Sequence, residues 1–146
     1  MPHFEAAKIL VDEARVEPAI ARARQGLARE PGSFYGLYTL GVVYQRAGLY
    51  RDAAQTFRQA VDANGRDPRA RANLADASLR IGDLDTAAEQ FGRLIDTGFQ
   101  VAPSEYNLGL IALKRGDRAE AARRFGLALE ADPKFQPARD ALARLK

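Results

Sequence analysis

Residues 102–135 read APSEYNLGLIALKRGDRAEAARRFGLALEADPKF, and residues 34–67 read FYGLYTLGVVYQRAGLYRDAAQTFRQAVDANGRD. These two segments and the one between them share a 34-residue period in four independent columns. The columns are Phe57, Phe91 and Phe125; Leu40, Leu74 and Leu108; Gly48, Gly82 and Gly116; and the alanine pairs that begin at Ala53, Ala87 and Ala121. An internal repeat of this length predicts an all-α solenoid rather than a globular enzyme.

Each repeat is expected to form two antiparallel helices joined by a tight turn. In residues 34–67, small and apolar residues recur at the i, i+3, i+4, i+7 spacing of a helix face, first around Leu40 and then around Phe57. Gly48 separates the two runs, at a place where a helix commonly ends in a left-handed residue.

Polar residues mark the expected helix starts. Ser33 and Asp67 each precede a helical run, and Asp67 is followed by Pro68, which suits the first helical position. In the last repeat, Asp117 and Glu120 have the spacing of a capping box.

Small residues recur where the two helices of a repeat must approach each other, and the phenylalanine column is expected to fill the space between helices. The small residues are Gly41, Ala75 and Gly109 on first helices, and Ala53, Ala87 and Ala121 on second helices. Gly92 and Gly126 also lie inside predicted helices, where glycine is costly, and the sequence offers no reason for them beyond a close helix contact.

The period weakens at both ends of the chain. In residues 1–33, Ala14-Arg15 replaces the glycine turn and Ala23 replaces the phenylalanine, whereas residues 136–146 hold only one helix. Terminal units of solenoids are often atypical because one face meets water. We therefore expect a single domain over residues 1–146, with a degenerate unit at 1–33, units at 34–67, 68–101 and 102–135, and a capping helix at 136–146.

Composition argues against several other classes of protein. The chain has 146 residues and no cysteine, which excludes disulfides and thiolate metal sites and suits a reducing, cytoplasmic location. Its start does not resemble a secretory signal, and its longest uncharged run, 32–45, is too short to span a bilayer. The formal net charge is +3, but the basic residues are dispersed, which argues against a nucleic-acid partner.

Catalytic and cofactor-binding patterns are also missing from the sequence. The single histidine, His3, has no nucleophile–carboxylate set around it, and no glycine-rich phosphate loop is present. We therefore predict no enzymatic activity, no cofactor and no metal.

The repeats resemble the tetratricopeptide repeat, a helix-turn-helix unit of the same length. The resemblance rests on Leu40-Gly41…Tyr44…Gly48…Ala53…Phe57…Ala60 and on Tyr106-Asn107-Leu108-Gly109…Gly116-Asp117…Ala121…Phe125…Ala128…Pro133. The middle copy departs from the pattern at Arg71, Ser78, Leu94 and Phe99.

The resemblance implies a right-handed superhelix whose concave groove, lined by the first helix of each pair, binds an extended peptide or a partner helix. The residues expected on that face are Phe4, Lys8, Tyr35, Tyr38, Val42, Arg69, Asn73, Asp76, Tyr106, Asn107 and Leu110. Asn73 and Asn107 lie one period apart, and an asparagine amide can pair with a peptide backbone. These residues also match the family consensus, which leaves a purely structural role open.

Chaperone-binding members of the family use a carboxylate clamp of Lys, Asn and Arg, but the places flanking Asn73 hold Tyr38, Val42, Pro103 and Asn107. The sequence therefore favours an interaction scaffold or adaptor that binds a peptide or helix of another protein without this clamp. Two alternatives remain: a structural protein that forms homo-oligomers through a thinly packed end at Ala14, Ala19 and Ala23, and a basic adaptor associated with nucleic acid.

Overall fold

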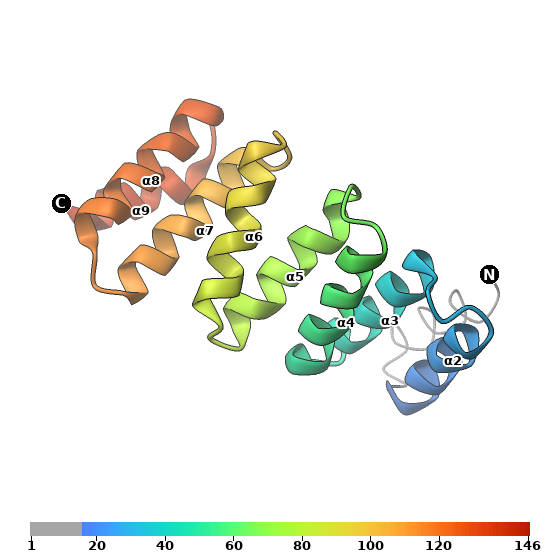
Figure 1. Cartoon of the computed structure of the whole chain (residues 1–146). Helices are drawn as coiled ribbons and strands as arrows, with labels where there is room; N and C mark the ends of the chain where they lie inside the picture. Colours follow the sequence, from blue (N-terminus) through green and yellow to red (C-terminus); the bar gives the residue numbers. More distant parts are fainter. Residues whose placement is uncertain (1–15) are drawn as a thin grey trace. The chain divides into compact units, whose positions relative to one another are not determined.

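The computed structural model describes residues 16–146, which form eight α-helices and contain no strand (Figure 1). The predicted all-α repeat fold is confirmed. The predictions for Phe4, Lys8 and Ala14-Arg15 lie outside the described residues. The helices are α2 (Val16–Arg29), α3 (Phe34–Arg46), α4 (Tyr50–Ala63), α5 (Pro68–Arg80), α6 (Leu84–Asp96), α7 (Val101–Lys114), α8 (Arg118–Ala131) and α9 (Gln136–Leu145).

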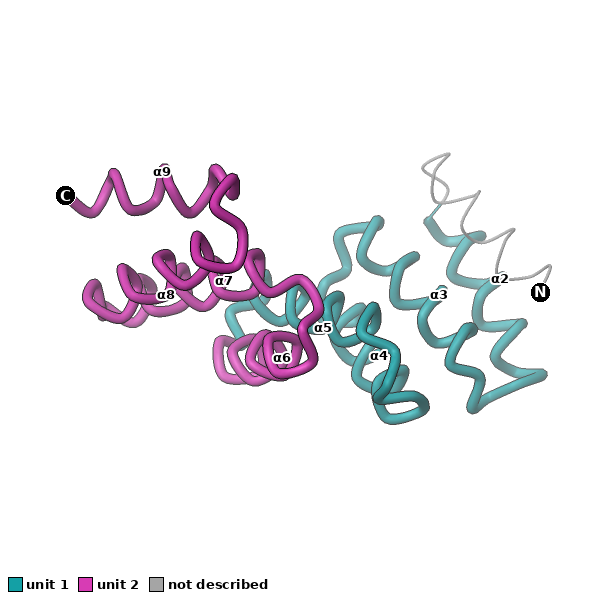
Figure 2. Tube along the Cα trace, turned by 90° about the horizontal axis from the view of Figure 1, so that it is seen from above, with its two compact units in different colours: residues 1–83 teal, residues 84–146 magenta. Residues whose placement is uncertain are grey.

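The chain divides into two compact units, residues 1–83 and 84–146, drawn in teal and magenta in Figure 2. We call them unit 1 and unit 2. The boundary follows Asp83 and therefore falls inside the predicted repeat 68–101. A single domain built from the four predicted units stays a prediction.

In unit 1, consecutive helices pack against each other, α2 on α3, α3 on α4 and α4 on α5. Phe57 is fully buried at the centre of this core, together with Leu40 and Leu74 of the leucine column. Ala19 and Ala23 of α2 are also fully buried there. Ala19 and Ala23 of the degenerate first copy thus belong to the core of unit 1.

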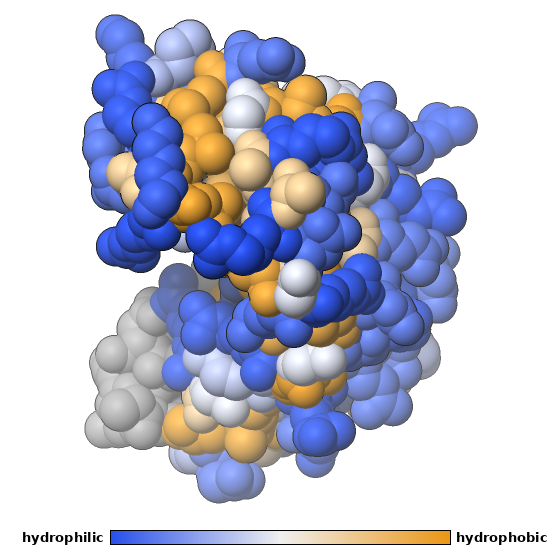
Figure 3. Space-filling model, turned by 90° about the vertical axis from the view of Figure 1, so that its left-hand side faces the viewer, coloured by the Kyte–Doolittle hydropathy of each residue, from blue (hydrophilic) through white to orange (hydrophobic). Residues whose placement is uncertain are grey.

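Unit 2 follows the same pattern, with α6 on α7, α7 on α8 and α8 on α9. Phe125 is fully buried, and Ala138 and Ala141 of α9 pack into its cluster. The helix after the last repeat therefore covers the apolar side of α8 with small residues. Figure 3 shows that apolar side chains remain visible in patches among hydrophilic ones on the face seen from the C-terminal side of Figure 1.

Glycines with positive φ terminate four helices in the same way. At Gly48 φ is +78°, and the amide of Leu49 donates to the carbonyl of Tyr44 at 2.9 Å. This is the Schellman arrangement, which satisfies a carbonyl that the helix end leaves open. Gly82 and Gly116 behave as predicted, and Gly98 adds a helix end that the sequence pattern did not reveal.

The predicted N-caps at Ser33, Asp67 and Asp117 are confirmed. Each side chain accepts a hydrogen bond from a backbone N–H of the following helix. The capping box at Asp117 is only half formed, because the Asp117 amide donates to the carbonyl of Ala112 and the Glu120 carboxylate pairs with Arg123 and Arg124. Two guanidinium groups compete successfully with one backbone N–H for this carboxylate.

The periodic glycines face the phenylalanine rings rather than other small residues. A Cβ atom at Gly41 would lie 2.5 Å from Phe57 Cε1, and Gly109 stands in the same relation to Phe125. Each ring also contacts a tyrosine of the same first helix, with centroids 6.0 Å apart for Tyr38 and Phe57 and 5.6 Å apart for Tyr106 and Phe125. In the first and last complete repeats, the phenylalanine therefore packs against both a glycine and a tyrosine of the first helix.

The middle repeat has neither of these partners. One period after Tyr38 and Gly41 it carries Ala72 and Ala75, and it buries the hydroxyl of Ser78 with no hydrogen-bond partner among the described residues. The compact units separate within this repeat, between Asp83 and Leu84.

Candidate functional site

The predicted groove residues fall on both compact units, so each surface is described by itself. Six of those that the structure describes lie in unit 1, and we call them the α3–α5 surface: Tyr35, Tyr38 and Val42 on α3, and Arg69, Asn73 and Asp76 on α5. Unit 2 carries three, which we call the α7 surface: Tyr106, Asn107 and Leu110.

Two side-chain contacts join the helices of the α3–α5 surface. The Arg69 guanidinium carbon lies 5.2 Å from the centroid of the Tyr38 ring, within the range of a cation–π interaction. Towards the other end, Gln45 Nε2 donates to Asp76 Oδ2 at 3.0 Å across 31 residues. Val42 and Asn73 have the same sequence separation as these two pairs and lie between them along the two helices.

Arg69 is held in place by the N-cap of its own helix. Its Nε and Nη2 atoms donate to the two carboxylate oxygens of Asp67, at 3.0 and 2.7 Å. These hydrogen bonds lower the pKa of Asp67 and raise the pKa of Arg69. The fork also orients the guanidinium over Tyr38, so the cation–π contact is prepared before any ligand binds.

The Asp76 carboxylate is already hydrogen-bonded to other side chains of the protein. Its Oδ2 accepts hydrogen bonds from Gln45 and from Arg80, the latter at 3.1 Å. The charge of Asp76 raises the pKa of Arg80, whose guanidinium also lies 4.9 Å from the centroid of the Tyr50 ring. This network connects α3, α4 and α5 at one end of the surface.

The three predicted tyrosines occupy different environments. Tyr38 stacks on Phe34 with centroids 5.9 Å apart, and Tyr106 lies 5.6 Å from Phe125 and 5.7 Å from Phe135. Tyr35 remains 37% exposed. Tyr38 and Tyr106 therefore contribute to scaffold packing, while Tyr35 offers the most accessible ring.

The two predicted asparagines also differ. Asn107 Nδ2 donates to the carbonyl of Pro103 in its own helix at 3.0 Å. In the described part of the chain, the Asn73 amide makes no hydrogen bond, and the side chain is half-buried. Asn73 thus keeps its full hydrogen-bonding capacity for a ligand, and Asn107 keeps only part of it.

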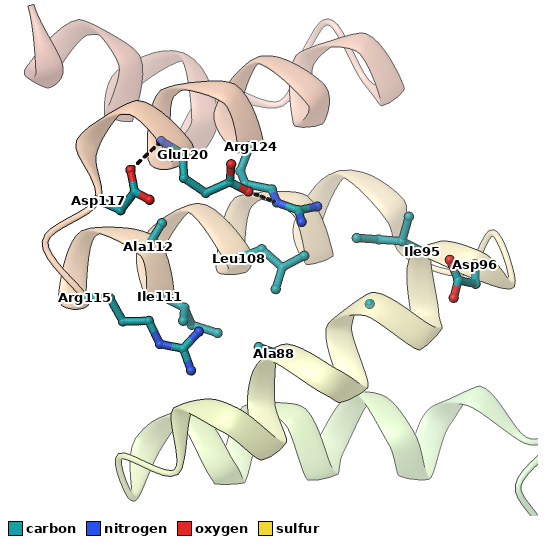
Figure 4. A pocket seen from close by; sticks show the side chains of 11 residues that line it. Ala88, Ile95, Asp96, Leu108, Ile111, Ala112, Arg115, Asp117, Glu120 and Arg124 are labelled. Atoms are coloured by element: carbon teal, nitrogen blue, oxygen red, sulfur yellow. Dashed lines mark hydrogen bonds and ion pairs between the residues drawn. The ribbon is translucent and has the colours of Figure 1, made fainter.

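A cavity in unit 2 was not foreseen from the sequence. It has a volume of about 550 Å³ and opens between α6, α7 and α8 (Figure 4). Its lining combines apolar and charged side chains: Ala88, Gly92, Ile95, Asp96, Leu108, Ile111, Ala112, Arg115, Asp117, Glu120 and Arg124. The one signal in the sequence was Gly92, a glycine inside a helix with no evident reason to be there.

Ion pairs surround this cavity. Arg124 donates to Glu105, whose side chain is 8% exposed, at 2.9 Å and to Glu120 at 2.8 Å. Hydrogen bonds from Arg123 and Arg124 outweigh partial burial and lower the pKa of Glu120 to about 2. Arg115 donates to Asp85 at 2.6 Å.

Within residues 16–146, no group of three or more His, Cys, Asp or Glu side chains is placed to hold a metal ion. No helix in that range has both the length and the apolar character needed to cross a bilayer.

Several known proteins share this architecture. The crystal structure of MamA superposes with a TM-score of 0.85 at 22% identity, covering 95% of this chain and 81% of that one. A tetratricopeptide repeat protein from Parabacteroides merdae gives 0.86 at 20% identity, covering 99% of this chain and 57% of that one. The first tetratricopeptide domain of Spaghetti (RPAP3), solved with the HSP90 peptide SRMEEVD, gives 0.69 at 20% identity, covering 77% and 89%.

No curated protein matches the chain by sequence. The family model described as tetratricopeptide repeat matches residues 38–102, the segment that runs from Tyr38 of α3 to the start of α7. Its match agrees with the helix pairs, the glycine turns and the phenylalanine column described above. Residues 38–102 therefore match the tetratricopeptide-repeat family.

Proposed function

We propose that this protein is a non-enzymatic, cytoplasmic interaction module that binds a peptide or helical segment of another protein. The α3–α5 surface of unit 1 is the main candidate contact, and the α7 surface of unit 2 is a second candidate described by itself. The observation that carries the proposal is the position of Arg69 over Tyr38, which joins two first helices into one continuous surface.

The chemistry of the α3–α5 surface suits a peptide. Tyr35 supplies an exposed ring with a polar tip, a residue type enriched at protein interfaces. The Asn73 amide can donate to and accept from a peptide backbone at once. Because Asp67 and Arg69 are already paired, the surface does not require a strongly charged ligand.

The ligand should differ from that of the Spaghetti domain, which is bound to the HSP90 peptide SRMEEVD. In this chain the positions where a carboxylate clamp would place its cations hold Tyr38, Val42, Pro103 and Asn107. Two cations missing from a carboxylate site remove the charge-assisted hydrogen bonds that such a site depends on. We expect no measurable binding of SRMEEVD in a fluorescence titration.

The variants used in the test must weaken binding without lowering the stability of the fold. Tyr38 and Tyr106 pack on core phenylalanines, so their replacement by alanine would confuse lost binding with lost stability. We instead use the double variant Arg69→Ala/Asn73→Ala. The matched control is Arg51→Ala/Gln59→Ala, which changes an exposed arginine and an exposed amide on α4 of the same unit.

The immobilised full chain is used to capture proteins from native cells, which are identified by mass spectrometry. Partners that wild type and the control retain, and that Arg69→Ala/Asn73→Ala loses, support binding at the α3–α5 surface. Circular dichroism verifies that all three proteins are equally helical. Retention of every partner by the double variant would show that this surface is not the binding site.

The alternative of homo-oligomers stays a prediction. Ala19 and Ala23 are buried in the core of unit 1, and Ala14 lies outside the described residues. Light scattering coupled to size exclusion tests the alternative directly, and a monomer at high concentration would contradict it.

A further inference from the structure

We propose that the cavity between α6, α7 and α8 is a second binding site, which takes an aliphatic side chain of a partner peptide with a basic residue beside it. This site lies within unit 2 and is separate from the α3–α5 surface, so it does not depend on the function proposed above.

The cavity has the size and lining of a side-chain pocket. Its volume of about 550 Å³ lies within the range of ligand pockets, roughly 300–1,000 Å³. The apolar side chains of its lining come from two helices: Ala88 and Ile95 of α6, and Leu108, Ile111 and Ala112 of α7. They lie below the charged side chains of α8 (Figure 4). An aliphatic group that enters would leave water for this apolar wall.

The cavity uses a different face of α7 from the predicted groove. Leu108, Ile111, Ala112 and Arg115 have the i, i+3, i+4, i+7 spacing of one helix face. Tyr106 and Leu110 point to the other side of the helix and pack around Phe125. A peptide in the cavity therefore does not compete for the α7 surface.

Specific residues keep the cavity open. Gly92 lines it, and a Cβ atom at this position would meet nothing within 4 Å. Leu74 is 1% exposed, but its counterpart one period later, Leu108, is only half-buried and lines the cavity. Glycine at position 92 therefore leaves this part of the cavity wall without a side chain.

A second exchange between repeats has the same effect. Ile81 packs against the core of unit 1, whereas Arg115, one period later, lines the mouth of the cavity and pairs with Asp85. Arg115 thus stands where an apolar side chain would help to fill the cavity. Its guanidinium pairs instead with Asp85, which does not line the cavity.

The charged side chains at the mouth of the cavity determine which kind of peptide residue fits beside the aliphatic one. Arg115 and Arg124 are neutralised by their ion pairs with Asp85, Glu105 and Glu120. Among the described residues, Asp96 and Asp117 have no cationic partner, and they stand at opposite ends of the cavity (Figure 4). The uncompensated charge is negative, so a lysine or arginine beside the aliphatic residue is the complementary group.

The test uses a random peptide library displayed on phage and panned against the full chain. Selected peptides are synthesised and titrated by fluorescence polarisation against wild type and three variants. Gly92→Leu fills the cavity, Asp96→Lys reverses a charge at its mouth, and Gly126→Leu is the matched control, because Gly126 also lies inside a helix with nothing within 4 Å but does not line the cavity.

We expect a class of peptides that pairs an aliphatic residue with lysine or arginine. Gly92→Leu should weaken this class by at least about tenfold, which corresponds to about 1.4 kcal/mol. Asp96→Lys should weaken it by about threefold, less at high salt, and Gly126→Leu should leave it unchanged.

Two outcomes would overturn the proposal. The first is that no selected peptide loses affinity on Gly92→Leu and Asp96→Lys. The second is that Gly126→Leu weakens binding as much as Gly92→Leu does. Peptides that keep their affinity for Gly92→Leu and lose it for Arg69→Ala/Asn73→Ala would reject the cavity site and still support the α3–α5 surface. Melting curves confirm that each variant is folded, and Asp96→Lys alters an exposed residue, so it remains informative if Gly92→Leu perturbs the helix.

Discussion

Gly41 lies directly against the ring of Phe57, at a distance that excludes any side chain larger than a hydrogen atom. A Cβ atom there would fall 2.5 Å from Cε1, and Phe57 has no exposed surface through which its ring could withdraw. The aromatic column and the glycine column of the repeat are thus two halves of one packing contact.

Gly41→Ala should destabilise the protein. The added methyl group overpacks the contact with Phe57, which typically costs about 1–3 kcal/mol, and this outweighs the gain of about 1 kcal/mol in helix propensity. Urea unfolding followed by circular dichroism measures the change in the free energy of unfolding. The matched control is Gly126→Ala, where nothing lies within 4 Å and stability should rise by up to about 1 kcal/mol. Equal shifts in both variants would contradict the contact.

Phe125→Ala should cost about 3–5 kcal/mol. The ring is fully buried and contacts Tyr106, so its removal leaves a cavity that the surrounding helices fill only in part. Thermal unfolding of the full chain gives the measurement, with Tyr106→Phe as the comparison, because that change keeps the ring contact. A loss below about 1 kcal/mol for Phe125→Ala would show that the ring is not a core element.

Ser78→Ala should leave stability unchanged or raise it, by up to about 1 kcal/mol. The Ser78 hydroxyl is fully buried and has no hydrogen-bond partner among the described residues, so alanine removes a desolvated polar group without opening a large void. The next repeat already carries Ala112 at this position. A clear loss of stability in urea would reveal a hydrogen bond to this hydroxyl in solution.

Glu120 should stabilise the fold at neutral pH and lose this effect in acid. Its pKa is lowered from 4.5 to about 2 by hydrogen bonds from Arg123 and Arg124. A lowered folded-state pKa contributes stability that is present above the unfolded value and disappears as the pH falls through the folded one. The difference in free energy of unfolding between wild type and Glu120→Gln should therefore shrink between about pH 5 and pH 2.

The size of this effect should be modest and should decrease with salt, because the carboxylate is partly exposed to solvent. Carboxyl chemical shifts of Glu120 measured by NMR across the same range report the pKa directly. A midpoint near the ordinary glutamate value would mean that the two arginines do not hold the carboxylate in solution.

Helices and their ends were predictable because they depend on residues close together in the chain. Ser33, Asp67 and Asp117 cap the helices that the sequence assigned to them, and Gly48, Gly82 and Gly116 adopt the expected positive φ. Gly98 escaped prediction because it lies outside the column that the other turn glycines share.

The candidate surfaces were predictable only in part. The spacing along α3 and α5 placed Tyr38 and Arg69 on first helices, but it did not show that Asp67 would orient the arginine over the ring. Nor did the spacing show that Asn107 would turn back to Pro103. Such details depend on which of several possible hydrogen-bond partners lies within reach of a side chain in the folded protein.

The sequence by itself determined the repeat length, the helix pairs, the small and aromatic columns and thereby the resemblance to the tetratricopeptide repeat. These follow from local propensity and from a hydrophobic period that survives substitution at single positions. Only the tertiary structure decided where packing is complete and where it is not. Whether Gly41 meets a ring and Gly92 meets empty space depends on side chains of other helices, and identical residues in the same kind of helix therefore reach opposite environments.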